Sequence, residues 1–313
     1  MKRPPDSMSP PRGLVLTDTD LKLFRWLWML RVLTLGQLRR LGYFQPEHNR
    51  LSSIHNVRKR MRRLWNAGYL SGDTLLKTRE RIYFLAEPAL PALRAHYGIE
   101  QRRLYRLSGL QSLRQVHHAL MAAECAVCIT ESIRQSPISS INLPPLGVPF
   151  YHTHAVGDVR KKKHVERFVT QENLRVAGHS APHRIRPDLV FALTQQDIAR
   201  LYFLEADRGS ESPQQIVAKQ LAYHHYFEAL DPKDLSRYRW QCYGTMRDFR
   251  VLLVTTDQRR VGTLTRALSG KPGFELMVIS SIDVVKEKNM VFDPIWTNRY
   301  GDRRALARPL PKG

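Results

Sequence analysis

Length, composition and charge narrow the class of this chain before any motif is considered. Its 313 residues suffice for about two domains, and 42% hydrophobic with 25% charged residues is the balance of a soluble globular protein. The net charge of +22 favours a polyanionic partner, nucleic acid before a membrane surface. No apolar run approaches about 18 residues, so neither a membrane span nor a signal peptide is expected. Three cysteines do not make a disulfide framework and indicate a reducing, cytoplasmic compartment.

The first third of the chain has the pattern of a small helical domain with a β-hairpin. Residues 1–16 form a tail that we expect to be disordered. After it, apolar residues recur at three- and four-residue steps, which predicts helices. Two strand-like runs around a basic turn follow the helices. Helix, helix, basic helix and hairpin is the order of a winged helix-turn-helix, predicted here for residues 17–100. The expected elements are helices at 20–33, 33–44 and 54–68, strands at 69–76 and 81–86, and a closing helix at 87–98.

The third helix concentrates positive charge on the faces away from its apolar stripe. Five of the six residues 58–63 are basic, whereas Val57, Met61 and Leu64 form the stripe. A winged helix places this helix in the major groove of DNA, where cations neutralise phosphates and release counterions. A solvated helix face, or a winged helix that contacts protein, is the alternative. The residues predicted to contact DNA are Asn56, Arg58, Lys59, Arg60, Arg62, Arg63, Lys77 and Arg79.

The rest of the chain has an α/β pattern. Beyond a basic linker (101–111), residues 112–306 are predicted to form a second domain, followed by a basic tail (307–313). Strand–helix–strand spacing after residue 249 implies a parallel or mixed sheet. Cys125 and Cys128 are spaced CxxC, but without a second pair they indicate buried core cysteines and not a zinc site. Because neither GxxxxGKS/T nor GxGxxG occurs, a nucleotide-hydrolysing motor is not expected.

Two histidines and a basic run between these patterns allow several interpretations. His152 and His154 could be metal ligands, or part of the histidine motif of rolling-circle nucleases, although residue 153 is Thr. The basic run at 160–164 is either a mobile loop or a DNA clamp.

Three carboxylates surround a predicted hairpin in the second domain. Its apolar runs are 189–193 and 201–204; Asp188 precedes the first, and Glu205 and Asp207 follow the second on one face of the strand. Ionised carboxylates are rarely buried unless they are paired or bind metal, so these three could supply the oxygen ligands of Mg²⁺. Alternatively, Asp188 caps a turn and Asp207 pairs with Arg208.

These residues together resemble a known family. Pro187-Asp188 and Glu205 on successive strands resemble the PD-(D/E)XK nuclease fold. With the preceding winged helix, the chain more narrowly resembles the replication-relaxation family of plasmid and integrative-element proteins, which includes MobC-type relaxases. The resemblance covers roughly residues 17–300. The segments that carry it are TDTDLKLFRWL, the basic third helix, RIRPDLVFAL, FLEADRGSES, KQLAYHHYF and VLLVTT.

The resemblance implies an α/β protein: an N-terminal winged helix followed by a restriction-endonuclease-like domain with a mixed sheet. It implies that the protein binds double-stranded DNA at a plasmid or mobile-element origin and nicks it hydrolytically, with an accessory mobilization or replication protein as a further partner. Asp188, Glu205 and Asp207 would hold Mg²⁺ or Mn²⁺. Asp207 stands where the family motif has lysine, and Lys219 or Arg208 would substitute for that lysine. The alternative is a DNA-binding replication or transcription regulator without enzymatic activity, built on a degenerate nuclease fold.

Overall fold

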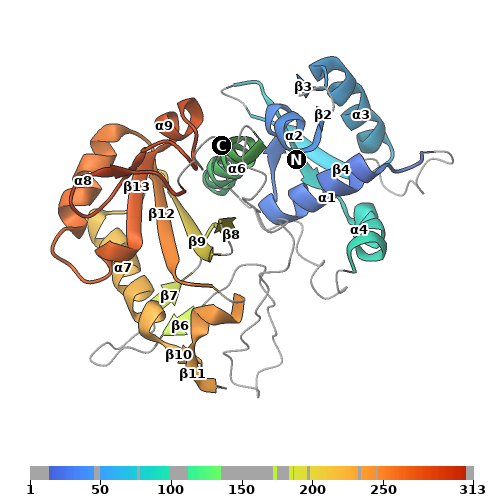
Figure 1. The fold of residues 1–313 in the computed structure, drawn as a ribbon. Coiled ribbons are helices and arrows are strands. Elements are labelled where there is room, and N and C mark those ends of the chain that lie inside the picture. Colours follow the sequence, from blue (N-terminus) through green and yellow to red (C-terminus); the bar gives the residue numbers. More distant parts are fainter. Residues whose placement is uncertain are drawn as a thin grey trace, which may run out of the picture. The chain divides into compact units, whose positions relative to one another are not determined.

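The structure is a computed structural model in which helices and strands form two compact units of mixed α/β architecture (Figure 1). Unit 1 comprises Met1–Val127 and unit 2 comprises Cys128–Gly313, so the boundary falls inside one helix, α6 (Leu113–Arg134). No helix in the described part of the chain is long and apolar enough to cross a membrane. The residues that the structure describes are 14–45, 50–75, 78–98, 112–134, 172–174, 183–185, 187–195, 198–231, 234–243 and 246–307.

Unit 1 combines helices with a small antiparallel sheet of strand order β1-β5-β4. Thr17 begins the first helix through a capping box with Asp20, so α1 starts two residues before the predicted residue 20. Ser53 caps α3, which begins at residue 54 as predicted. The elements are α1 (Asp18–Leu30), β1 (Leu33–Thr34), α2 (Leu35–Gly42), β2 (Phe44–Gln45), β3 (Arg50–Leu51), α3 (Ile54–Asn66), β4 (Leu70–Thr74), β5 (Arg81–Leu85), the 3₁₀ turn η2 (Glu87–Ala89) and α4 (Leu90–Tyr97).

The core of unit 1 forms where the apolar stripes of its helices meet the sheet. Val57, Met61 and Leu64 of α3 are fully buried, as their spacing predicts. The part of α6 that belongs to unit 1 also packs here, because Val116 joins a buried cluster with Ile82 of β5. The predicted core cysteines of α6, Cys125 and Cys128, are both buried, and neither forms a disulfide.

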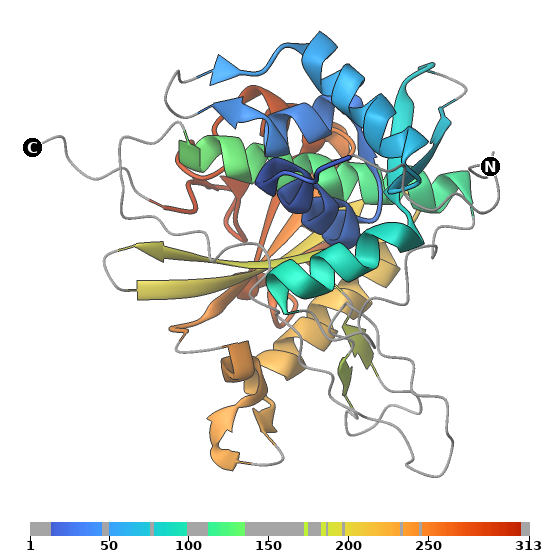
Figure 2. The same cartoon turned by 90° about the vertical axis from the view of Figure 1, so that its right-hand side faces the viewer.

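Unit 2 is built on a six-stranded mixed sheet of order β15-β14-β13-β12-β9-β8 (Figure 2). β9, β12 and β13 run parallel, while β8 and β14 are antiparallel to their neighbours. The strands and helices are β6 (Glu172–Leu174), β7 (His183–Ile185), β8 (Leu189–Gln195), β9 (Ile198–Asp207), α7 (Pro213–Glu228), β10 (Leu230–Asp231), β11 (Asp234–Tyr238), β12 (Phe249–Thr255), α8 (Gln258–Leu268), β13 (Met277–Ser281), α9 (Ile282–Glu287), β14 (Trp296–Thr297) and β15 (Arg303–Arg304). Two 3₁₀ turns, η3 (Arg239–Tyr243) and η4 (Phe274–Leu276), complete the unit.

Helices α7 and α8 cover one face of this sheet. Leu201 and Phe203 of β9 pack in one buried cluster with Tyr223 of α7 and Leu264 of α8. Side chains of a strand alternate between faces, so the next two residues of β9 with this orientation are Glu205 and Asp207. The hydrophobic pattern of β9 therefore places two carboxylates beneath the helices.

The structure corrects one strand boundary and adds elements to the prediction. The apolar run 274–280 predicts a strand from residue 274, but β13 begins at Met277, because Gly273 has a positive φ of 87° and starts η4. The short elements α9, β14 and β15 lack a periodic pattern and were not predicted. Several predicted features lie outside the described residues, namely His152, His154, the 160–164 run, Lys77 and the linker at 101–111.

Candidate functional site

The β8–β9 hairpin places Asp188 beside Glu205. Leu189 pairs with Leu204 in the antiparallel register, so Asp188 stands at the level of Glu205 on the next strand. Asp188 N–H donates to the carbonyl of Leu204 at 2.8 Å, and the Asp188 Oδ2 accepts a hydrogen bond from Ala206 N–H, also at 2.8 Å. The backbone of β9 thus holds the Asp188 carboxylate in place.

Glu205 is buried between the sheet and α7, where two side chains bind it. The residue is 3% exposed. Tyr223 donates its hydroxyl to Oε1 at 2.6 Å, and Lys219 Nζ lies 3.0 Å from Oε2. Lys219 and Tyr223 are four residues apart, so one face of α7 presents both to the same carboxylate.

Burial dominates the electrostatics of this carboxylate. Loss of hydration raises the pKa of Glu205; the charge of Lys219 opposes this shift and that of Asp188 adds to it. Burial alone would lower the pKa of Lys219, but Glu205 and Glu211 outweigh it and raise that pKa above its ordinary value. Glu211 Oε2 lies 2.9 Å from Lys219 Nζ, so Lys219 stays protonated between two carboxylates.

Asp207 belongs to a different set of contacts at the carboxyl end of β9. Arg260 of α8 donates its Nε–H to Oδ2 at 2.9 Å, and Gly209 N–H donates to Oδ1 at 2.8 Å. The hydroxyl of Thr255, at the end of β12, lies 3.3 Å from Oδ2. A cation that holds Asp207 is therefore Arg260, which is 53 residues away in the sequence.

Asp188 and Glu205 suit a metal ion such as Mg²⁺ that takes only one or two ligands from the protein. The described residues contain no group of three or more His, Cys, Asp or Glu side chains that could hold a metal ion. Asp188 and Glu205 form a carboxylate pair, and Mg²⁺ commonly binds one or two carboxylates and completes its shell with water and substrate phosphate. The structure thus brings Asp188, Glu205 and Lys219 together, and it holds Asp207 at Arg260 instead.

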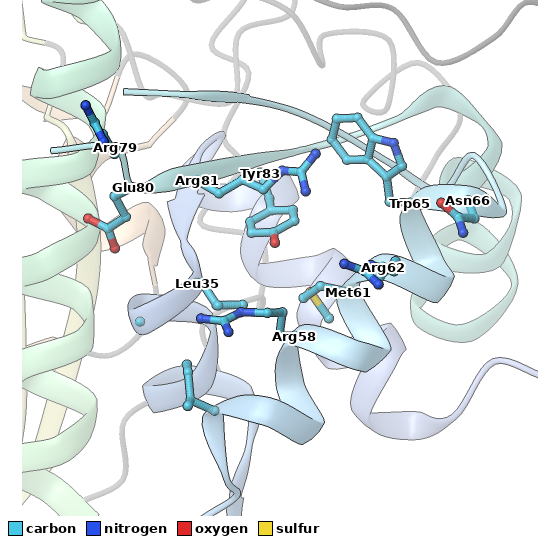
Figure 3. A pocket seen from close by; sticks show the side chains of 12 residues that line it. Leu35, Arg58, Met61, Arg62, Trp65, Asn66, Arg79, Glu80, Arg81 and Tyr83 are labelled. Atoms are coloured by element: carbon cyan, nitrogen blue, oxygen red, sulfur yellow. The ribbon is translucent and has the colours of Figure 1, made fainter. Parts of the chain in front are cut away.

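Unit 1 contains a second candidate site, a groove of about 610 Å³ between α3 and the β4–β5 hairpin. We call it the α3–hairpin groove. Arg58 and Arg62 of α3 line it together with Arg79 and Arg81 from the hairpin (Figure 3). The lining therefore has four arginines against one carboxylate, Glu80, and its net positive charge attracts phosphate.

Trp65 connects the two sides of the α3–hairpin groove. The Arg81 guanidinium carbon lies 4.7 Å from the centre of a Trp65 ring, a cation–π contact. The indole can approach β4 because residue 72 is glycine: a Cβ there would meet Trp65 Cζ3 at 2.7 Å and the Ile82 carbonyl oxygen at 2.4 Å. The site set predicted from the sequence omitted Trp65, Asn66 and Arg81, since the pairing that brings them to the groove is not visible in a one-dimensional pattern.

Most of the described residues that we predict to contact DNA are exposed or line the α3–hairpin groove, whereas Arg60 binds a buried carboxylate. Arg58, Arg62 and Arg79 line the α3–hairpin groove, and Asn56, Lys59 and Arg63 are exposed on α3. Arg60 has a structural position instead, because its Nε–H donates to buried Asp20 at 2.9 Å and its NH2 donates to the Val15 carbonyl, also at 2.9 Å. The hydrogen bond to Asp20 raises the pKa of Arg60. Lys77 lies outside the described residues.

Comparison with known proteins identifies one match. A family model described as Replication-relaxation matches residues 24–234, more than half of the chain. The matched segment runs from α1 into β11, so it includes α3, Asp188, Glu205 and Lys219 and ends before Arg260. Neither the curated proteins nor the solved structures contain a match.

Proposed function

The chain belongs to the replication-relaxation family, and we propose that it is a cytoplasmic protein that processes DNA at a plasmid or mobile-element origin. In this proposal unit 1 binds double-stranded DNA, and unit 2 nicks one strand at Asp188 and Glu205 with Mg²⁺ or Mn²⁺. An accessory mobilization or replication protein is the partner that we expect at the origin.

The topology and charge of unit 1 support its role in DNA binding. Three helices precede the β4–β5 hairpin, and β5 also pairs with β1, so the strand order is β1-β5-β4. This is the arrangement that we expect of a winged helix. The helix that would enter the major groove is α3, and its exposed basic residues adjoin the α3–hairpin groove. In this proposal Arg58, Arg62, Arg79 and Arg81 would bind phosphates, and Asn66 at the end of α3 would contact a base edge.

One observation carries the nuclease proposal: Asp188, Glu205 and Lys219 converge, although Lys219 comes from a helix and not from the strand. In this proposal Asp188 and Glu205 take the role of the carboxylate pair of the PD-(D/E)XK pattern, and Lys219 takes the role of its lysine. A bound metal ion would activate water and offset charge on the scissile phosphate. Tyr223 and Lys219 orient Glu205, the Ala206 N–H orients Asp188, and the Lys219 ammonium is near enough to stabilise a phosphate oxygen.

The test is metal-dependent nicking of a supercoiled plasmid that carries the cognate origin, with the accessory protein supplied. Wild type should form open circles with Mg²⁺ or Mn²⁺ and none with EDTA. Glu205→Gln and Lys219→Met should lose nicking and retain DNA binding. Glu287→Gln and Lys286→Met, matched changes at exposed positions of α9, should nick normally. Normal nicking by Glu205→Gln would refute the assignment.

A second candidate is a non-enzymatic DNA-binding regulator of replication or transcription. The observation that favours it is that each buried acid on β9 already has a cation, Glu205 with Lys219 and Asp207 with Arg260. Such pairs would suffice to hold a degenerate nuclease fold together. In that case wild type, Glu205→Gln and Lys219→Met would all bind origin DNA without metal-dependent cleavage, while Arg58→Gln with Arg62→Gln would weaken binding.

A further inference from the structure

The hairpin at the far edge of the unit 2 sheet carries an exposed basic surface. We call residues 298–304 the edge hairpin; it joins β14 to β15, the outermost strand in the described sheet. Residues 299–304 are all exposed, and they contain three arginines against one aspartate. Tyr300 is 68% exposed, and the side chain of Arg304 is 64% exposed. The arginines are Arg299, Arg303 and Arg304.

A buried asparagine and a glycine with positive φ shape this turn. Asn298 is 8% exposed, and its Oδ1 accepts hydrogen bonds from Tyr300 N–H at 2.9 Å and Asp302 N–H at 3.0 Å. Its own N–H donates to the Asp302 carbonyl at 3.0 Å, and Gly301 has the positive φ of 84° that the turn requires. The conformation therefore comes mainly from Asn298 and Gly301. Arg304 Nη2 lies 3.8 Å from Asp302 Oδ2, but both side chains face solvent, so this ion pair adds little to the stability of the turn.

The arrangement of the exposed side chains indicates a ligand. Arg299 lies over the Tyr300 ring, with its guanidinium carbon 4.6 Å from the ring centre, so a cation and an aromatic group are presented together. Nucleic-acid-binding surfaces combine these two groups. Cations on an edge strand also prevent edge-to-edge pairing of sheets. That role would account for Arg303 and Arg304 on β15, but not for Arg299 and Tyr300, which lie in the turn.

We propose that the edge hairpin is a second DNA-contacting surface, which binds the phosphate backbone of duplex DNA without reading its sequence. The inference takes DNA as the partner from the proposed function. It is independent of the carboxylate site, because β12, β13 and β14 separate β15 from β9 in the sheet. It also lies beyond residues 24–234, so the family match does not account for it.

The test is the salt dependence of duplex binding by the full-length protein, measured by fluorescence anisotropy. The variant combines Arg299→Gln, Arg303→Gln and Arg304→Gln. Each phosphate contact contributes about 0.9 to the slope of log K against log salt, so the slope should become shallower by up to about 2.7. The control removes the same charge from exposed positions elsewhere in unit 2, through Arg266→Gln, Lys286→Gln and Lys288→Gln, and should keep nearly the wild-type slope.

The outcomes separate this inference from the proposed function. If the edge-hairpin variant and the control bind alike, the inference is refuted while the nicking assay still decides the function. If the edge-hairpin variant alone loses slope and no metal supports nicking, the inference stands and the nuclease proposal falls. Absence of salt-dependent binding by wild type would refute both.

Discussion

Replacing Arg60 by alanine should destabilise unit 1, because Arg60 neutralises a buried carboxylate. Asp20 is fully buried, and it accepts two contacts from the Arg60 guanidinium, one of them at 2.9 Å. Loss of one partner from a buried ion pair costs about 3–5 kcal/mol, since the other charge is left without compensation. The Arg60 side chain is 18% exposed, and Asp20 keeps hydrogen bonds from the N–H and hydroxyl of Thr17. We therefore expect a loss of about 2–3 kcal/mol in the free energy of unfolding.

Urea unfolding followed by tryptophan fluorescence measures this loss, because Trp26 and Trp28 lie in α1, the helix that contains Asp20. Arg63→Ala is the matched control: it removes the same charge from an exposed position of α3 and should change stability by no more than about 0.5 kcal/mol. In an Asp20→Asn background, Arg60→Ala should cost less, because no buried charge remains. Equal stability of Arg60→Ala and Arg63→Ala would refute the structural role of Arg60.

Three further predictions concern the α3–hairpin groove and the carboxylate site. Arg58→Gln with Arg62→Gln should weaken duplex binding and make the salt slope shallower by up to about 1.8 while thermal unfolding is unchanged; a wild-type slope would exclude these residues from the interface. Burial raises the pKa of Glu205, so the metal-free folded protein binds the proton of the Glu205 carboxyl group more tightly than the unfolded chain does. The contribution of Glu205 to stability should therefore decline as the pH rises from the ordinary glutamate pKa through the raised one. Glu205→Gln, measured in EDTA, should remove that decline, whereas exposed Glu287→Gln should keep it; the same pH dependence in both would contradict the pKa direction. Gly72→Ala should cost about 1–3 kcal/mol, because its Cβ would meet the Ile82 carbonyl oxygen at 2.4 Å, and Trp65 fluorescence should report the shift; unchanged stability and fluorescence would show that β4 adjusts freely.

Local patterns in the sequence were sufficient for most of the secondary structure. The start of α1 at Thr17, the buried stripe of α3 and the β8–β9 hairpin all follow from interactions between residues close in the chain, namely caps, helical periodicity and alternation. The short β14 and β15 could not be found in this way, because two-residue strands have no period and exist only through pairing with β13 and with each other.

The positions of charged residues in the sequence also indicated which side chains belong to the candidate sites, but not which partners they bind. The sequence by itself determined that Asp188, Glu205 and Asp207 would gather at one hairpin and that α3 would expose cations. Only the tertiary structure decided that Lys219 binds Glu205, that Arg260 takes Asp207 and that Arg60 is drawn to Asp20, 40 residues away. The physical reason is that a buried carboxylate needs a cation as a partner. The sequence offers several arginines and lysines for each carboxylate and does not distinguish between them. The packing of α7 and α8 on the sheet, and of α1 against α3, determines which of them is within reach.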